Sequence, residues 1–448
     1  QQQQQQQQRQ QPQQGAQQQG GGGSGKEARS KSAHVAVKET ATKALHDRLT
    51  EAQIGSISDV VMKVFGQLVP QDDEMAARTK ICSKLEQAIQ MQWPGTKLQL
   101  FGSSGNNLCT KGSDLDLCLH VPYDLLHPNN DSQHRRGAQN RDRDRHQKLQ
   151  KQKKKDLESF LMKLAVLLRN GGMIDVEPIT TARVPIVKFK VRDGIASTLE
   201  CDLCINNVLA CFNTELLSNF TMLDWRVRPL VYCIKLWVKR RKIHEPYKGY
   251  LSSYSYTLMV IHYLQREGVL VCLQDLGRQE AEAARDPALL VLDKYDCYFY
   301  RSVEALAGIG ESCNASQLGL LLVGFFYFYS RLFPIKEAVI SVRKGDMLSK
   351  KDKGWEKPKE RNRHVICIED PFDVDVDLGR YVDELTIKDI QQELGRAVDI
   401  LLQTGDLDQV LKEWTEDEVA DPATPGSGLQ RSCSKETALH LEDDAHDS

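Results

Sequence analysis

The spacing of apolar residues changes twice along the chain. Apolar positions recur with a helical period over about residues 40–68 and 72–93. Short alternating or apolar runs then predict strands at 97–101, 114–121, 186–191 and 198–205. From residue 223 to 411 the pattern is mostly helical again. Strands grouped between helices predict an α+β fold, with a sheet domain and a mainly helical domain built from the front and rear helices.

Both ends of the chain have compositions typical of disorder. Fifteen of the first twenty residues are Gln, and we expect residues 1–35 to form a disordered Gln/Gly-rich tail. Residues 415–448 hold nine acids and two bases, so we expect 413–448 to be an acidic disordered tail. The chain starts with Gln rather than Met, and we therefore expect either a fragment of a longer protein or a mis-set start.

Composition and charge exclude wholesale disorder and a uniformly basic coat. The 448 residues are 40% hydrophobic and 27% charged, which is enough apolar material for two or three domains. The net charge is −2, so any nucleic-acid contact must come from local patches. Two patches qualify, 134–155 at net +8 and 343–363 at net +5, the second resembling a mobile basic loop. For each, contact with a phosphate backbone and plain solvation both stay open.

The twelve cysteines are scattered and form no secreted-type disulfide framework, and no signal peptide is visible. A reducing compartment follows, and the interpretation favours the cytoplasm, with the nucleus as the alternative. Cys201 and Cys204 form the single CxxC pair, but on a strand they point to opposite faces, which favours core thiols over zinc ligands. The longest apolar block, 318–329, is too short for a bilayer, so we expect a buried helix and no membrane partner.

The clearest chemical pattern is a strand ending at Gly102-Ser103, followed by Asp114-x-Asp116 on the next strand. Residues i and i+2 of a strand share a face, so both carboxylates project together. Two neighbouring carboxylates repel unless a cation lies between them, and Mg²⁺ takes oxygen ligands and substrate phosphates. Gly102 lets backbone amides approach a polyphosphate, and Ser103 adds a hydroxyl donor.

A third acid lies inside the apolar strand 198–205. A carboxylate buried there, at Asp202, is costly without a partner. If this strand pairs near Asp114 and Asp116, three carboxylates would hold two metals, Mg²⁺ or Mn²⁺. Glu200 shares the face of Asp202, and the pattern alone does not exclude it.

These residues resemble the DNA polymerase β-like nucleotidyltransferase superfamily, in which an apolar-flanked Gly-Ser precedes Asp-x-Asp and a distant third Asp. Further motifs at 206–217, 235–240, 251–255 and 368–373 resemble the terminal uridylyltransferases and cytoplasmic poly(A) polymerases, over about residues 60–400. The resemblance implies a nucleotidyltransferase domain at 60–220 with a basic insertion at 123–155. It also implies a helical PAP-associated central domain at 36–59 and 221–412, with the active-site cleft between the two domains.

The resemblance also assigns residues to the nucleotide. Lys235 and Lys239 lie i, i+4 on one predicted helix and match lysines that bind the triphosphate, aided by a serine matching Ser253. Tyr254 matches a tyrosine that stacks on the base. Asn213 and Thr214 match residues that contact the ribose, although a capping or turn pair explains them equally well without the resemblance. Phe101, Gly102 and Ser103 of the Gly-Ser motif are also assigned to nucleotide binding.

The choice of base depends on the segment after Glu369-Asp370-Pro371-Phe372. Uridylyltransferases carry a His there that hydrogen-bonds uracil. This chain has Val376 instead, which favours either a relaxed choice of nucleotide or a preference for ATP. Against that, the segment has the length of the uridylyltransferase form, and Asp370 and Asp373 match acids near the uracil edge. The resemblance as a whole leans slightly to UTP, with ATP close behind.

The sequence therefore predicts a template-independent RNA 3′-terminal nucleotidyltransferase, with Asp114, Asp116 and Asp202 as catalytic metal ligands. Its partners would be an RNA 3′ end and a nucleoside triphosphate, and we expect a monomer. The RNA substrate would be selected by the basic segments, by a protein partner or by sequence before Gln1. Two other classes stay open: an inactive RNA-binding scaffold of the same fold, and a related transferase such as a DNA repair polymerase or an oligoadenylate synthase.

Overall fold

The computed structural model describes residues 45, 47–128, 142–182, 184–192, 198–284, 291–292, 295–302, 317–359 and 362–415. The predicted Gln/Gly tail at 1–35 and nearly all of the acidic tail at 413–448 lie outside these residues. Residues 129–141 of the basic insertion lie outside them as well.

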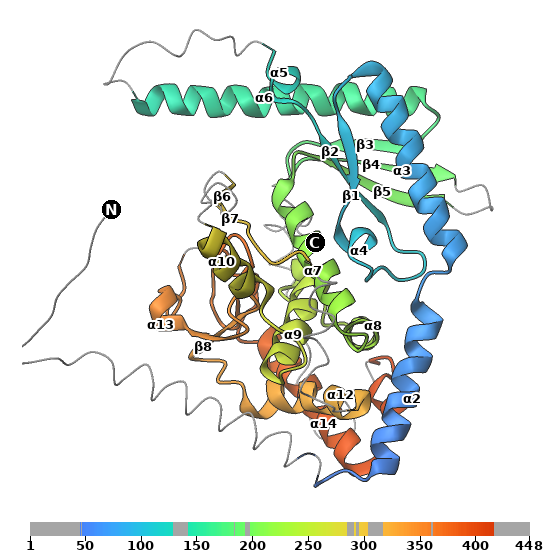
Figure 1. Cartoon of the computed structure of the whole chain (residues 1–448), viewed down its shortest axis with the longest axis vertical. Helices are drawn as coiled ribbons and strands as arrows, with labels where there is room; N and C mark the ends of the chain where they lie inside the picture. The colour runs from blue at the N-terminus through green and yellow to red at the C-terminus, as the bar shows by residue number, and fades with distance from the viewer. Residues whose placement is uncertain are drawn as a thin grey trace, which may run out of the picture.

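A five-stranded mixed sheet forms one body of the molecule (Figure 1). Its strands run in the order β1-β2-β5-β4-β3, and β2 and β5 are the parallel pair at the centre. The bounds are β1 Lys97–Leu100, β2 Leu115–His120, β3 Ile174–Ile179, β4 Ile186–Arg192 and β5 Thr198–Ile205. The sequence pattern predicted four of these strands, and it missed β3.

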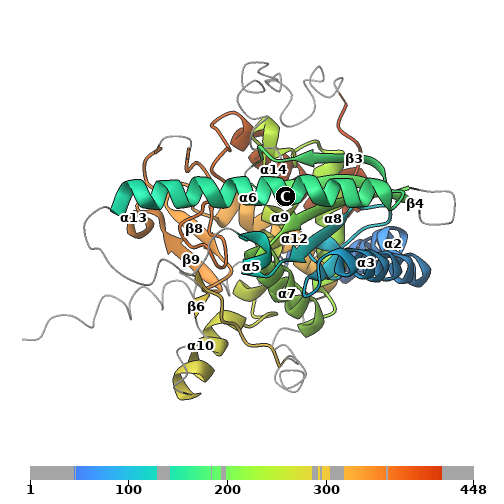
Figure 2. The ribbon, with the colours of Figure 1, turned by 90° about the horizontal axis from the view of Figure 1, so that it is seen from above.

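Alternation along β2 assigns its two faces. Leu115, Leu117 and Leu119 are fully buried in a core shared with helices α3 (Asp72–Gln92) and α6 (Asp142–Asn170). Asp116 and Cys118 point to the opposite face, as the period of two requires. One sheet face therefore carries the core, and the other is left for chemistry. Residues 142–155 of the basic insertion form the first part of α6, which crosses above the sheet in Figure 2.

The second body is mainly helical. It contains α2 (Glu51–Leu68), α7 (Val208–Leu223), α8 (Val227–Arg240), α9 (Ser253–Arg266), α10 (Leu273–Ala284), α12 (Leu318–Tyr327), α14 (Thr386–Thr404) and α15 (Leu407–Val410). Front and rear helices do pack together, because α2 contacts both α8 and α12. The expected domain boundary at residue 60 falls inside α2, whose buried residues Ile54, Ile57, Val61 and Val64 all join the helical core.

The helical prediction for 223–411 missed a small sheet. Strands β8 (Ala338–Ser341), β9 (Asp346–Ser349) and β10 (Cys367–Ile368) pair in the order β10-β8-β9. Strands β6 (Val291–Leu292) and β7 (Tyr295–Asp296) form a short hairpin. The expectation of a mobile loop at 343–363 is wrong for most of that stretch. Lys350 is buried and donates to the carbonyls of His364 and Val365, which fixes α13 (Lys350–Lys353).

The apolar block at 318–329 is a buried helix, as expected, with α12 continuing into a π-helical turn at Phe328–Leu332. Among the residues the structure describes, none of the helices combines the length and the apolar character needed to cross a bilayer.

Candidate active site

The three predicted aspartates meet on the open face of the central strand pair. β2 and β5 run parallel, and their register places the Cα atoms of Asp116 and Asp202 opposite each other. Asp114 lies directly before β2, two residues from Asp116 and so on the same face. All three line a pocket of about 520 Å³. Glu200 shares their face, but its side chain is 60% exposed and ion-paired with Lys190, away from the pocket lining.

The Gly-Ser motif lies against these carboxylates. After β1, Phe101 leads into a helical turn, α4 (Gly102–Gly105), and Gly102 has a left-handed φ of +61°. A Cβ atom at Gly102 would overlap the carboxylate of Asp116, so glycine is required here for two reasons. The amide of Gly102 donates to the hydroxyl of Thr214 at 2.9 Å, which ties α4 to α7.

The pocket brings together nine of the predicted residues. Besides the three aspartates, its lining includes Phe101, Asn213, Tyr254, Asp370, Asp373 and Val376. The Tyr254 hydroxyl donates to Asn213 Oδ1 at 2.8 Å, so the expected base and ribose contacts are coupled. Burial raises the pKa of Tyr254 well above its ordinary value, which keeps this hydroxyl protonated.

The other six predicted residues lie outside that lining. Gly102, Ser103 and Thr214 are behind it, and the Thr214 hydroxyl is already used by Gly102 and by the carbonyl of Ala210. Ser253 begins α9, but its neighbour Ser252 lines the pocket and caps the helix through the amide of Ser255.

The two lysines of α8 are separated in the structure. Lys235 is held beneath the site, where its ammonium donates to the carbonyl of Leu108 at 2.8 Å. Burial lowers the pKa of Lys235 to about 8, partly opposed by the nearby Cys109 and Asp116. Lys239 is exposed close to the end of the helix, near His244. Triphosphate binding by both lysines stays a prediction.

The carboxylates form a donor set suited to divalent cations. Burial first, and then the charges of Asp202 and Asp114, raise the pKa of Asp116 to about 7. Burial also raises the pKa of Asp114, followed by the charges of Glu200 and Asp202. Lys188, opposite Asp202 on β4, is 3.4 Å from its carboxylate and supplies part of the missing positive charge. Hard oxygen ligands that repel one another in this way fit Mg²⁺ or Mn²⁺.

A pH dependence of stability follows from Asp116. Its pKa is higher in the folded state than in the unfolded chain, so the folded state binds the proton more tightly. The free energy of unfolding of the metal-free protein should therefore fall as pH rises from about 4 to about 7, by on the order of 4 kcal/mol from this group. Urea unfolding in EDTA should show Asp116→Asn more stable than wild type at pH 8, with less than half of that advantage left at pH 5. A difference that does not change with pH would contradict this assignment.

Arg78 is a site residue that the sequence pattern did not reveal. It lies on α3 with a side chain 1% exposed. Its guanidinium donates to the Ser113 carbonyl at 2.6 Å, to the Asp114 carbonyl at 3.4 Å and to the Ser104 hydroxyl at 3.2 Å. The Ser104 hydroxyl in turn donates to the Asp114 carbonyl. Arg78 thus fixes the segment that delivers Asp114 against the α4 turn.

Replacing Arg78 should weaken both the fold and the site. Arg78→Lys keeps the positive charge but loses the forked donor geometry, leaving buried carbonyls unpaired. We expect the free energy of unfolding to fall by about 2–4 kcal/mol in urea titration. Lys80→Ala, at an exposed position of the same helix, is the control and should change it by less than about 0.5 kcal/mol. Equal effects of the two substitutions would mean that Arg78 is not structural.

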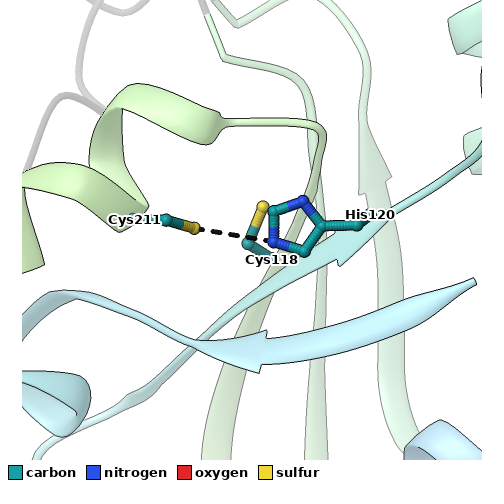
Figure 3. A group of neighbouring side chains, drawn as sticks. All are labelled: Cys118, His120 and Cys211. Atoms are coloured by element: carbon teal, nitrogen blue, oxygen red, sulfur yellow. Dashed lines mark hydrogen bonds between the residues drawn. The ribbon is translucent and has the colours of Figure 1, made fainter. Parts of the chain in front are cut away.

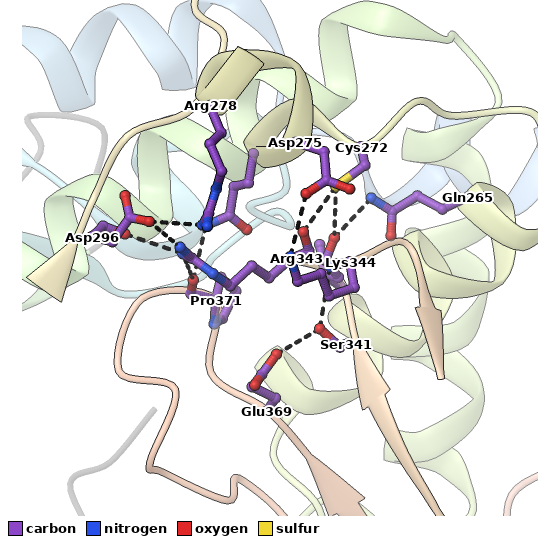
Figure 4. A network of polar contacts seen from close by, with 12 residues as sticks. Gln265, Cys272, Asp275, Arg278, Asp296, Ser341, Arg343, Lys344, Glu369 and Pro371 are labelled. Atoms are coloured by element: carbon purple, nitrogen blue, oxygen red, sulfur yellow. Dashed lines mark hydrogen bonds and ion pairs between the residues drawn. The ribbon is translucent and has the colours of Figure 1, made fainter. Parts of the chain in front are cut away.

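The far wall of the pocket is a loop held from behind by a polar network (Figure 4). The carbonyl of Pro371 accepts from Arg343 at 3.0 Å and from Gln274 at 2.8 Å. Glu369 is buried and receives the Ser341 hydroxyl and the Lys353 ammonium. These contacts fix the backbone on either side of Asp370.

The front of this loop presents three side chains to the pocket. The Asp370 carboxylate accepts the amides of Phe372 and Asp373, both at 2.9 Å. Burial nevertheless raises the pKa of Asp370. Val376 closes the turn through its amide, which donates to the Asp373 carbonyl at 2.9 Å. Asp370, Asp373 and Val376 are therefore held in fixed positions, opposite the aspartates of the sheet.

Two matched regions identify the family. Residues 57–222 match the central palm domain of mitochondrial-like poly(A) RNA polymerases, and residues 317–376 match the Cid1 family poly A polymerase domain. Terminal uridylyltransferase cid1 of Schizosaccharomyces pombe is 30% identical over 76% of this chain and 77% of its own length. The chain belongs to the Cid1 family. A solved Cid1 structure covers 80% of this chain and 98% of its own, with 28% identity and a TM-score of 0.65.

The family includes relatives named for different nucleotides. Terminal uridylyltransferase 7 of Homo sapiens is 34% identical over 74% of this chain, which covers 20% of that protein. Poly(A) RNA polymerase cid13 of Schizosaccharomyces pombe is 29% identical over 82% of this chain, which covers 57% of it. The chain thus spans only part of these two relatives. The fold is that of the polymerase β-like nucleotidyltransferases, as the sequence predicted.

Proposed function

We propose that this chain is a template-independent RNA 3′-terminal nucleotidyltransferase. The observation that carries the proposal is the convergence of Asp114, Asp116 and Asp202 on one wall of a pocket whose other wall carries Asp370, Asp373 and Val376. The family supports the same class, since cid1 is named a terminal uridylyltransferase and cid13 a poly(A) RNA polymerase. The intact set of carboxylates argues against an inactive scaffold.

The residues divide into three roles. Asp114, Asp116 and Asp202 would hold two Mg²⁺ or Mn²⁺ ions, which neutralise charge on the transferred phosphoryl group and its leaving pyrophosphate. Asp202, on the central strand β5, also lines the pocket and would take the proton of the attacking 3′-hydroxyl. Tyr254 and Asn213 would orient the base and ribose, so that most of the acceleration comes from positioning and charge neutralisation.

UTP is the proposed first substrate and ATP the alternative. Terminal uridylyltransferases 7 and cid1 support UTP. Val376 supports ATP, because an apolar side chain offers no hydrogen bond to a uracil edge. Asp370 and Asp373 beside it supply the acceptors on this wall.

Incubating the chain with a short RNA or DNA, Mg²⁺ and each nucleotide separately tests the proposal. We expect extension of RNA, with UTP incorporated fastest and ATP next, and no extension of DNA. Extension of DNA would favour a repair polymerase. No extension with any nucleotide or metal would favour the scaffold. Repeating the assay with Mn²⁺ compares the two ions.

The partners would be an RNA 3′ end and a nucleoside triphosphate. Exposed lysines at 148, 151, 154 and 155 on α6 offer one basic surface for RNA, and a protein that delivers RNA is the alternative route to selection. A monomer and a cytoplasmic location stay predictions.

A further inference from the structure

A second group of metal-ligand side chains lies next to the aspartates on the same sheet face. Cys118 follows Asp116 by two residues on β2, and Cys204 follows Asp202 by two residues on β5. The parallel register pairs Cys118 with Cys204, as it pairs the two aspartates. His120 is the next residue of β2 on this face. Three ligand side chains therefore share one patch of the sheet.

Helix α7 brings a fourth ligand onto this patch. After β5 the chain reverses at Asn206, which has a φ of +52° and whose side chain pairs with both backbone groups of Val121. The first turns of α7 then place Cys211 over the strands (Figure 3). Its Sγ is 3.9 Å from His120 Nε2.

The distances are close to those of a tetrahedral zinc centre. The ligand atoms of Cys118, His120 and Cys211 all lie within 4.8 Å of one another. Zn–S bonds of ~2.3 Å and Zn–N bonds of ~2.1 Å put tetrahedral ligand atoms roughly 3.5–3.8 Å apart, so shifts of about an ångström would close these three around an ion. Cys204 lies opposite Cys118 in the strand register but outside this group, and its side chain would have to turn toward the ion. Three thiols and an imidazole are soft ligands that select zinc, unlike the oxygen set of the aspartates.

We propose that Cys118, His120, Cys204 and Cys211 form a zinc site that fastens α7 to the sheet. Cys118 is 0% exposed, Cys204 1% and Cys211 7%, and His120 is partly exposed. Cys204 also lines the active-site pocket, which gives an ion a route of entry.

Zinc binding exchanges one hydrogen bond. His120 Nε2 is 3.0 Å from Gln99 Oε1 in the metal-free structure. A zinc ion would take the Nε2 lone pair, the ring proton would move to Nδ1, and Gln99 would be released. The coordinating thiols would give up their protons to solvent and bind as thiolates. Metal coordination far outweighs one neutral hydrogen bond, so the exchange favours the bound state.

The position of the site gives it a structural role. Helix α7 carries Asn213 and Thr214, and the sheet carries Asp116 and Asp202. At present α7 is tied to the α4 segment by the hydrogen bond between Thr214 and Gly102, by bonds from Asn107 to Ser218 and Thr221, and by packing. A zinc ion bonded to both elements would fix the ribose side of the pocket relative to the carboxylates.

A competing group elsewhere is already satisfied. His364, Cys367 and Asp377 also lie within 4.8 Å of one another. There, however, Asp377 Oδ2 is hydrogen-bonded to His364 at 2.8 Å, and Oδ1 accepts the amides of Ile368 and Gly379. Binding a metal would break a complete buried network, so this group serves as the comparison in the test.

Metal analysis of the purified full chain tests the site without relying on activity. The Asp114→Asn, Asp116→Asn double variant should be used as the background, so that zinc on the aspartates does not count. We expect one equivalent of zinc per chain by mass spectrometry, and thiolate charge-transfer and tetrahedral d–d bands after exchange with Co²⁺. A chain with fewer than about 0.2 equivalents after dialysis against Zn²⁺, or Co²⁺ spectra without thiolate bands, would overturn the proposal.

Single substitutions locate the metal. Cys118→Ala and Cys211→Ala should each weaken Zn²⁺ binding by more than about tenfold. Replacing a residue that only hydrogen-bonds to a metal ligand already costs about that much. Cys201→Ala, on β5 like Cys204 but in the core of the other sheet face, should keep the zinc. Loss of zinc in Cys367→Ala with retention in Cys118→Ala would assign the metal to the other group and overturn the proposal. Circular dichroism confirms that each variant is folded.

Discussion

Asp116→Asn is expected to lower single-turnover nucleotide incorporation by at least about a thousandfold, ~4 kcal/mol of transition-state stabilisation. Asp116 is the most enclosed of the three carboxylates and is flanked by the other two and by Gly102. Asn preserves its shape but removes the charge that a divalent cation needs. The measurement is rapid-quench incorporation into an RNA primer at saturating nucleotide and Mg²⁺.

The same substitution should leave the fold intact, because it relieves repulsion among the carboxylates. Asp124→Asn, at an exposed position of α5 (Tyr123–Leu126), is the matched control and should change the rate by less than about threefold. A rate for Asp116→Asn within about tenfold of wild type would remove Asp116 from the catalytic group.

Val376→His is expected to raise the ratio of kcat/KM for UTP over ATP by about 10–100-fold. Val376 lies in the fixed turn between Asp373 and Leu378 and faces the pocket. A His there supplies a polar group to the uracil edge and crowds the larger purine. Initial rates with each nucleotide, at several concentrations, give the ratio directly.

Val376→Leu separates the polar effect from the steric one. Leu adds bulk but no hydrogen bond, so its ratio should stay within about threefold of wild type. If Leu and His shift the ratio equally, volume rather than hydrogen bonding determines the choice of base. If neither shifts it, the base does not occupy this end of the pocket.

The sequence predicted that Asp114 and Asp116 lie together because their geometry is local. Asp114 and Asp116 share a face because side chains alternate along a strand. Asp202 stands out because an acid within an apolar run is costly to bury without a partner. The register that places Asp202 opposite Asp116 is not local, because parallel pairing joins strands far apart in the chain. The resemblance to a known family supplied that step.

Other features depended on tertiary contacts that no local pattern encodes. Arg78 looks like a surface charge on a helix, yet its partners lie 26, 35 and 36 residues away. Lys235 and Lys239 share a helix face, but only Lys235 is covered by the neighbouring segment. The strands β8, β9 and β10 have four residues or fewer, too short for periodicity to reveal. The cluster of Cys118, His120 and Cys211 has no CxxC spacing, since its residues come from two elements.

The central claim is that carboxylates from distant segments act as one metal-binding group, and β5 offers a direct test. Asp202 and Glu200 lie two residues apart on one face, but only Asp202 lines the pocket. The measurement is the single-turnover rate of RNA extension by Asp202→Asn and by Glu200→Gln over a range of Mg²⁺ concentrations. The account predicts that Asp202→Asn loses at least about a hundredfold at every concentration, whereas Glu200→Gln stays within about threefold of wild type. Near-wild-type extension by Asp202→Asn, or an equal loss in both variants, would contradict it.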